Sequence, residues 1–285
     1  MDRGTDMPWV ARGREIDLSR PVLMGIVNAT PDSFSDGGQA LDPDDAARRA
    51  MRLVADGAGI IDIGAESTRP GAGQVPEDEE ARRLFPVLAA VRRAVGVPIS
   101  IDTRRSGIAA RALELGADIV NDVSALEDPG MARVVAESGA GLVVMHGYRG
   151  HLAFPSGNPA ARCGIGDVVA FLRERVAVAC DAGIPRSAIA VDPGFGFGKS
   201  NAESAAILRG LAQLRTLGLP IVAALSRKRF LADLPEASAA KDRDEATRVA
   251  LRMAVAGGAS ILRVHVAAGF RPPPRPSRLA GAIRA

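Results

Sequence analysis

Short apolar runs rich in β-branched residues occur eight times along this 285-residue chain, and each stops abruptly at a polar residue or a turn. An amphipathic helical stretch follows nearly every run. Strands that alternate with helices predict β-α units and a parallel sheet, and eight units within one domain length predict an α/β fold of the (β/α)8 (TIM) barrel type. The runs end near Asn28, Glu66, Asp102, Asn121, His146, Asp192, Ser226 and His265. Because the carboxyl ends of barrel strands share one catalytic rim, we expect these polar residues to gather there.

The pattern predicts strands over residues 22–28, 60–65, 99–102, 118–122, 142–146, 189–192, 221–225 and 260–265. A helix should begin after Asp42-Pro43 and end at Gly57, and another should begin at the acidic run 77–80. Residues 148–165 have no periodicity, and their length suggests a lid or a disordered tip.

The chain divides into three predicted parts. Residues 1–20 are polar and irregular, with Trp9 and Ile16 as the anchors of an N-terminal cap over the barrel bottom. Residues 21–266 form the barrel as one domain. Residues 267–285 are an atypical tail with four prolines, so the final helix should be weak or missing, with at most a short helix over 277–285.

Composition argues against nucleic-acid-binding, disulfide-stabilised, zinc-stabilised and membrane-spanning proteins. The formal net charge is +3 with a pI of about 9.3, but the arginines are spread along the predicted helices, which favours solvated faces over a nucleic-acid patch. The two cysteines, Cys163 and Cys180, support neither a disulfide framework nor a structural zinc site. No apolar run is long enough for a signal peptide or a membrane span, so we expect a soluble, cytoplasmic protein without nucleic-acid or membrane partners.

Polar loops follow the first two strands. Residues 28–38 (NATPDSFSDGG) carry an amide, carboxylates and hydroxyls that could hold a hydrated cation and cover a ligand. On the second loop, Thr68 and Arg69 lie among glycines, which suits phosphate oxygens. Each loop could also be an ordinary polar turn.

Carboxylates and amides end three of the middle strands: Asp102, then Asn121-Asp122, then Asp192. On one rim they would suit a flat heterocycle with several N–H donors, because they accept such donors bidentately. The alternative is that they cap the following helices or pair with arginines.

The run 192–200 (DPGFGFGKS) resembles a phosphate-binding loop but has the wrong glycine spacing, so that interpretation is rejected. Phe195 and Phe197 could form apolar walls for a planar ligand, or one or both could enter the core.

Cationic residues follow the last two strands, in residues 226–230 (SRKRF) and 263–265 (RVH). Their convergence would make a pocket for an anionic group such as a phosphate or diphosphate, whereas a surface basic cluster is the alternative. His146 could be a core histidine, and the three histidines lack the spacing of a metal triad, so a protein-ligated zinc ion is not expected.

The runs NATPDSFSDGG, ESTRPGA, IDT, IVND, DPGFGFGK, SRKRF and RVH together resemble the bacterial dihydropteroate synthase family, over most of residues 21–265. The resemblance implies a magnesium-assisted transferase of folate biosynthesis and a target of sulfonamides. It would join 6-hydroxymethyl-7,8-dihydropterin diphosphate to para-aminobenzoate, giving dihydropteroate and diphosphate.

The resemblance also implies roles for single residues. Asn28 would contact the metal, and Asp36 would stabilise a carbocation-like pterin. The pterin would be held by Asp102, Asn121, Asp192 and Lys228. The diphosphate would be bound by Thr68, Arg263 and His265, with Arg69 on the second loop. The para-aminobenzoate pocket would comprise Phe34, Pro70, Phe197 and the SRKRF segment, where Arg229 or the nearby helix start would receive the carboxylate. Asp36, Lys228 and Arg69 are the expected catalytic residues.

Three departures from the family pattern matter. Val266 follows His265 where the family usually has Asp-Val, the proline-rich tail replaces the last helix, and Gly147 replaces the methionine usual after His146. Because that helix contributes to dimerisation in the family, a homodimer would be weakened. Two other functions stay open at this point: a catalytically impaired pterin-binding paralogue, and a methyltetrahydrofolate-using corrinoid methyltransferase.

Overall fold

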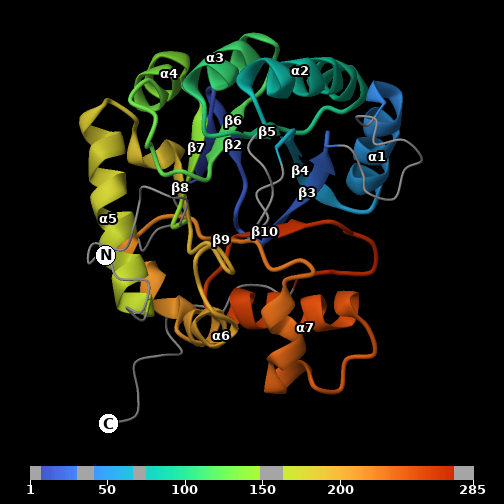
Figure 1. The fold of residues 1–285 in the computed structure, drawn as a ribbon, viewed down its shortest axis with the longest axis vertical. Helices are drawn as coiled ribbons and strands as arrows, with labels where there is room; N and C mark the ends of the chain where they lie inside the picture. Colours follow the sequence, from blue (N-terminus) through green and yellow to red (C-terminus); the bar gives the residue numbers. More distant parts are fainter. Residues whose placement is uncertain (1–7, 31–41, 67–74, 148–162, 273–285) are drawn as a thin grey trace.

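Eight parallel strands form one sheet in the computed structural model of the protein, which describes residues 8–30, 42–66, 75–147 and 163–272. In chain order the strands are β3 (Val22–Asn28), β4 (Ala58–Gly64), β5 (Ile99–Asp102), β6 (Ile119–Asp122), β7 (Gly141–Met145), β8 (Ile189–Asp192), β9 (Val222–Ala223) and β10 (Ile261–Val264). The spatial order is β8-β7-β6-β5-β4-β3-β10-β9. A parallel bridge between Val191 and Ile221 joins the two ends of this order, so the sheet closes into the predicted barrel (Figure 1).

Helices surround the strands, as Figure 1 shows. The α-helices are α1 (Pro43–Ala55), α2 (Glu77–Ala94), α3 (Ser106–Glu114), α4 (Met131–Ser138), α5 (Ile165–Asp181), α6 (Asn201–Arg209) and α7 (Arg243–Ala256). Short 3-10 helices are η1 (Arg186–Ala188), η2 (Leu211–Leu217), η3 (Arg229–Asp233) and η4 (Pro235–Ala237). The predicted start of α1 is confirmed, because the Asp42 side chain accepts hydrogen bonds from the N–H groups of Asp44 and Asp45. None of the helices within the described ranges has both the length and the apolarity that crossing a bilayer requires.

Strand boundaries agree with the predictions at β3, β5 and β8, and no end differs by more than two residues elsewhere. The strand predicted over residues 221–225 is present as β9 but is shorter than predicted. Only Val222 and Ala223 pair regularly with β10, while Ile221 makes the single bridge that closes the barrel.

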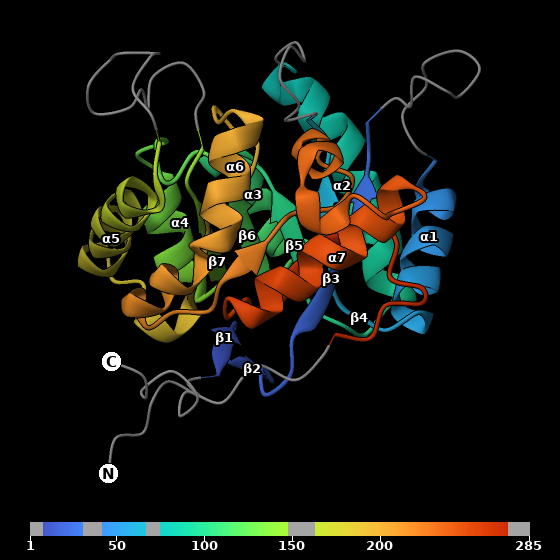
Figure 2. The ribbon, with the colours of Figure 1, turned by 90° about the horizontal axis from the view of Figure 1, so that it is seen from below.

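A β-hairpin closes the base of the barrel. Its strands β1 (Trp9–Ala11) and β2 (Arg14–Ile16) pair in antiparallel fashion, so the expectation of an irregular segment was wrong for these residues (Figure 2). Trp9 is completely buried among inward-facing residues of the barrel, and its indole N–H donates to the carbonyl of Ala188 at 2.9 Å. The hairpin therefore fills the interior from the end opposite the carboxyl ends of the strands.

The chain forms no helix between β10 and Pro272, the last described residue, and most of the predicted proline-rich tail lies outside the described residues. Ala267 and Phe270 are buried and join the core between the sheet and the helices. Arg49 of α1 donates to the carbonyls of Ile26 and His265, at 3.1 and 3.2 Å, and so links α1 to both neighbouring strands.

Candidate active site at the carboxyl ends of the strands

Side-chain alternation decides which strand residues face the barrel interior. A lower inward-facing layer is apolar and packs on the hairpin: Met24, Ile60, Ile119, Val143, Ala190, Val222 and Ile261. Successive strand residues point to opposite faces, so the residue two positions later faces the interior again, one layer closer to the rim. On four strands this next residue is polar or charged: Asp62, Asn121, Asp192 and Arg263. The period of two therefore gathers polar groups from separate strands in one layer.

Arg263 joins two carboxylates across this layer. Its Nε atom donates to Oδ2 of Asp62 at 2.6 Å, and its Nη2 atom donates to Oδ2 of Asp102 at 2.7 Å. Asn121 Nδ2 lies 3.5 Å from the same oxygen of Asp62. The other oxygen of Asp62 is buried and has no hydrogen-bond partner among the described residues. A buried carboxylate oxygen without a donor is costly, which points to a ligand that supplies one.

The charges in this cluster do not balance, because one guanidinium faces two carboxylates. Burial raises the pKa of Asp102 to about 7; Arg263 opposes this shift, and the Asp62 carboxylate adds to it. Burial alone would lower the pKa of Arg263, but the two carboxylates raise it above its ordinary value, so the guanidinium stays charged. Near neutral pH the cluster can therefore hold an additional proton on Asp102.

Asp192 and Lys228 extend the cluster toward the rim. Asp192 is buried at the end of β8, and its Oδ1 atom accepts a hydrogen bond from the N–H of Gly194 at 2.7 Å. Burial raises the pKa of Asp192, and the charges of Lys228 and Arg263 counteract this rise. The Nζ atom of Lys228 lies 4.3 Å from the centre of the Phe197 ring. An acid, an ammonium group and an aromatic face thus lie at the ends of β8 and β9.

The glycine-rich loop after β8 folds around Lys199. Its ammonium group donates to the carbonyls of His146, Gly194 and Phe197 at 3.0, 2.8 and 3.1 Å. Burial lowers the pKa of Lys199 to about 8. The lysine of this motif is thus a brace for the loop, in agreement with the rejection of a phosphate-binding loop. Phe195 is buried and stacks on Phe230, so it belongs to the core.

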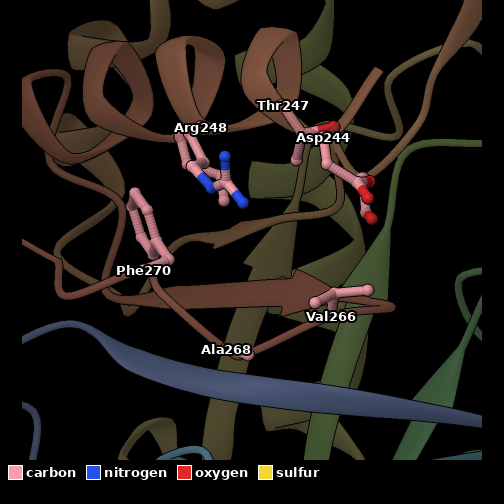
Figure 3. Close-up of a pocket in the computed structure, with 8 residues that line it drawn as sticks. Asp244, Thr247, Arg248, Val266, Ala268 and Phe270 are labelled. Atoms are coloured by element: carbon pink, nitrogen blue, oxygen red, sulfur yellow. The ribbon is translucent and has the colours of Figure 1, made fainter. Parts of the chain in front are cut away.

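The segments that follow β9 and β10 meet at the rim through Ser226 and His265. The Ser226 hydroxyl lies 2.9 Å from Nδ1 of His265 and accepts a hydrogen bond from the His265 N–H at 3.2 Å. Next to Ser226, the guanidinium of Arg227 forms a bidentate ion pair with Asp244 of α7. Figure 3 shows the small hollow beside these residues, between α7 and residues 266–270, with Asp244, Thr247 and Arg248 on its α7 side.

Comparisons with known proteins agree with this geometry. Residues 24–265 match the family described as pterin binding enzymes. The dihydropteroate synthase of Bacillus subtilis is 41% identical over 250 residues, covering 86% of this chain and 84% of that protein. The chain belongs to the dihydropteroate synthase family.

Further matches carry the same family name. A probable bifunctional folylpolyglutamate synthase/dihydropteroate synthase of Haloferax volcanii is 44% identical over 243 residues, but this chain covers only 28% of its length. A solved Xanthomonas albilineans dihydropteroate synthase with 4-aminobenzoic acid has a TM-score of 0.82, 39% identity, and coverage of 93% of this chain and 94% of that one. The same enzyme in complex with 7,8-dihydropteroate has a TM-score of 0.77, 37% identity, and coverage of 90% and 91%.

The structure brings many of the predicted dihydropteroate synthase residues together. Those that converge on the interior and rim are Asp102, Asn121, Asp192, Phe197, Lys228, Arg263 and His265. Asn28 and Arg229 are exposed, at the end of β3 and the start of η3 respectively. The remaining predicted residues lie outside the described ranges: Phe34, Asp36, Thr68, Arg69 and Pro70. Asp122 instead accepts hydrogen bonds from the N–H groups of Ser124 and Leu126, and it serves the following turn.

Two features of the candidate site were missed from the sequence. Asp62 lies inside an apolar run. It stands two positions after Ile60, which faces the interior, and this spacing could have identified it as an inward-facing carboxylate. The second is a buried ion network beside the stems of the segment 67–74. Arg105 pairs with Glu66 and Glu80, and it donates to the carbonyl of Val75 at 2.5 Å. Residues before and after this segment are therefore held by one side chain.

Proposed function

We propose that this protein joins 6-hydroxymethyl-7,8-dihydropterin diphosphate to para-aminobenzoate, giving 7,8-dihydropteroate and diphosphate. The observation that carries the proposal is the inward-facing cluster of Asp62, Asp102, Asn121 and Asp192 around Arg263, with Lys228 at the rim. A pterin ring presents several N–H donors and ring acceptors in one plane, and this cluster offers the matching partners.

Within the proposed function, the carboxylates and Asn121 hold the pterin ring at the floor of the site. The oxygen of Asp62 that has no described partner would accept one of the pterin N–H donors. Arg263 keeps Asp62 and Asp102 in place and limits their mutual repulsion. Lys228 lies close enough to Asp192 for their charges to interact, so it can donate to the ring from the rim side.

The diphosphate leaves the methylene carbon with the electron pair of the C–O bond. Negative charge then grows on its oxygens, and we propose that His265, which contacts Ser226 at the rim, binds them. Thr68 and Arg69 are proposed to act with His265. Arg263 was also predicted to bind diphosphate; in this structure it pairs with two carboxylates, so we propose that any such contact is shared with them.

Magnesium fits this site only as a hydrated ion. No group of three His, Cys, Asp or Glu side chains that could hold a metal occurs among the described residues, so an all-protein cage is not supported there. The exposed Asn28 amide oxygen at the end of β3 can supply one ligand, and Mg²⁺ usually takes its others from water and phosphate oxygens. When bound, the ion would neutralise charge on the diphosphate.

Para-aminobenzoate is proposed to bind on the rim side of the pterin. Phe197, with Lys228 over its ring, supplies one wall, while Phe34 and Pro70 are proposed for the others. Arg229, exposed at the start of η3, is proposed to receive the carboxylate. The neutral aniline nitrogen attacks the methylene carbon and afterwards gives a proton to the departing diphosphate or to solvent, and no enzyme nucleophile is needed. Asp36 is proposed to stabilise positive charge on the pterin during this step, and positioning with exclusion of water supplies much of the acceleration.

The test is a diphosphate-release assay with pterin diphosphate, para-aminobenzoate and Mg²⁺, with and without a sulfonamide competitor. We expect release that depends on both substrates and is inhibited competitively with para-aminobenzoate. Lys228→Ala and Asp192→Asn should each lower turnover severely while thermal stability stays nearly unchanged. The control is Lys241→Ala, at an exposed lysine, which should leave turnover unchanged. Pterin binding without turnover in folded wild-type protein would instead establish the paralogue suggested by the proline-rich C-terminal sequence.

Assembly and location complete the proposal. We propose a homodimer that is weaker than in relatives with a final helix, because the described chain after β10 has none. Light scattering across a concentration series tests this, and a monomer at every concentration would exclude it. We propose that the protein acts in the cytoplasm, which fractionation of cells tests.

A further inference from the structure

Arg227 has a backbone conformation that is unusual for its residue type. Its φ angle is +57°, in the left-handed region that L-residues other than glycine rarely adopt. Arg227 is the third residue of a turn closed by a hydrogen bond from the Lys228 N–H to the Leu225 carbonyl at 3.2 Å. Glycine or asparagine is the usual residue where such a turn needs positive φ. Something outside the turn must therefore hold Arg227 in this state.

Helix α7 supplies those restraints. The Arg227 N–H donates to Oγ1 of Thr247 at 3.0 Å, and Thr247 in turn donates to the Arg243 carbonyl at 2.7 Å. The guanidinium of Arg227 donates to both carboxylate oxygens of Asp244, at 2.8 and 2.9 Å. Backbone and side chain of one strained residue are thus fixed to the first turns of a single helix.

The residue that follows Arg227 is Lys228. Its Nζ atom lies 4.3 Å from the centre of the Phe197 ring, and its Cδ atom would lie 3.7 Å from a Cβ added to Gly196. Because the φ angle of Arg227 sets the direction in which the chain enters Lys228, a return of Arg227 to negative φ would move the ammonium group away from Phe197.

We infer that Asp244 and Thr247 are positioning residues for the reaction, which act through the left-handed Arg227 to place Lys228 over Phe197. The expected change in KM rests on the proposed function, whereas the expected change in the position of Lys228 does not. The proposed function gives Asp244 and Thr247 no substrate contact; they hold Arg227, next to Lys228.

Two substitutions of Arg227 distinguish positioning through its positive φ angle from a direct effect of its charge. Arg227→Ala and Arg227→Gly both remove the guanidinium, but only glycine adopts positive φ without a steric cost. We expect Arg227→Ala to raise the KM for pterin diphosphate about tenfold and Arg227→Gly to stay within about threefold of wild type. Equal losses in the two variants would overturn the inference.

Asp244→Ala should behave like Arg227→Ala in the wild-type background, but should have little effect when residue 227 is already glycine. The control is Glu236→Ala, because Arg209 and Glu236 form a bidentate pair of nearly the same geometry and exposure, with side chains 46% and 36% exposed against 44% and 35% for Arg227 and Asp244. A merely structural ion pair would give the same result in both pairs: a small change in thermal midpoint and an unchanged KM.

A readout without substrate keeps the two proposals apart. The chain has only three lysines, Lys199, Lys228 and Lys241, so 13C-dimethylated lysines give few, assignable NMR signals. The Lys228 methyl signal should be shifted by the Phe197 ring current in wild type and Arg227→Gly, and should lose that shift in Arg227→Ala and Asp244→Ala. If the Lys228 signal were unchanged in Arg227→Ala and Asp244→Ala, the inference would be wrong, whatever the turnover of these variants. If the signals changed as expected but the wild-type protein showed no turnover, only the proposed function would be rejected.

Discussion

Asp102→Asn should make the ligand-free protein more stable at alkaline pH, although it removes a charge that contacts Arg263. Asp102 has a pKa of about 7 in the folded protein against about 3.9 in an unfolded chain. Between these values the folded state keeps a proton that the unfolded state has released, so wild-type stability falls as the pH rises through this window. Above pH 7 both states are ionised, and the full penalty is present.

The size of the effect follows from the shift. About three pKa units at about 1.4 kcal/mol each give a ceiling near 4 kcal/mol at pH 8. Asparagine resembles the protonated acid, so we expect Asp102→Asn to exceed wild type by about 2–4 kcal/mol at pH 8 and to differ little at pH 4. Urea unfolding followed by circular dichroism, repeated from pH 4 to 8.5, measures the difference.

Asp128→Asn provides a control of opposite sign. Burial favours the neutral form of Asp128, but hydrogen bonds from the N–H groups of Ser106 and Gly130 outweigh it and lower the pKa. This variant should be less stable than wild type at pH 8, and the gap should close as the pH falls through the lowered pKa. If Asp102→Asn were also less stable at pH 8, with a gap that did not vary with pH, the ion pair with Arg263 would dominate and our account of the cluster would be wrong.

Three further predictions concern the same rim. Gly194→Ala should lower folding stability by at least about 3 kcal/mol, because the added Cβ would lie 1.9 Å from the His146 carbonyl oxygen. Gly13→Ala, also at positive φ but with open space around it, should lower stability by only about 1 kcal/mol. Thermal melts of both variants check this, and similar losses of stability would contradict it. Burial lowers the pKa of His146 to about 3, so folding stability is lost as the pH falls below about 6.5, and His146→Leu should recover about 2 kcal/mol of this loss at pH 5 in acid-unfolding curves. N–H donors of a bound pterin favour the ionised form of Asp102, so binding near pH 6.5 should release part of a proton; calorimetry in buffers of different ionisation enthalpy should detect it, and Asp102→Asn should abolish it.

The barrel was predictable because most strand residues are apolar on both faces of the sheet and the runs stop at or near a polar residue or a turn. Such runs are visible without any partner, and β3, β5 and β8 have the predicted bounds. The hairpin β1–β2 was not predictable in the same way. Its strands have three residues each, and its turn uses Arg12 and Gly13 at positive φ rather than an Asn-Gly pair. Trp9 fixes it by filling the barrel, which is a tertiary contact.

The site was predictable where a residue ends a strand and unpredictable where it depends on a partner. Asp102, Asn121 and Asp192 stand at strand ends, so the architecture alone brings them together. The preference of Arg263 for Asp62 and Asp102 joins residues 201 and 161 positions apart and could not be derived from local pattern.

Unfavourable features of this protein gather at the end of the barrel where we place the reaction. The described residues other than glycine with positive φ are Arg12, Ala125, Leu126 and Arg227, and all but Arg12, which lies in the hairpin turn, follow the carboxyl end of a barrel strand. The excess of buried carboxylate over guanidinium lies beneath the same rim. Packing alone gives no reason to keep either feature, because neutral or glycine substitutions would relieve both. Ligand binding gives that reason. A bound pterin ring would donate hydrogen bonds to the buried carboxylates, and the positive φ of Arg227 would direct Lys228 at the same ring.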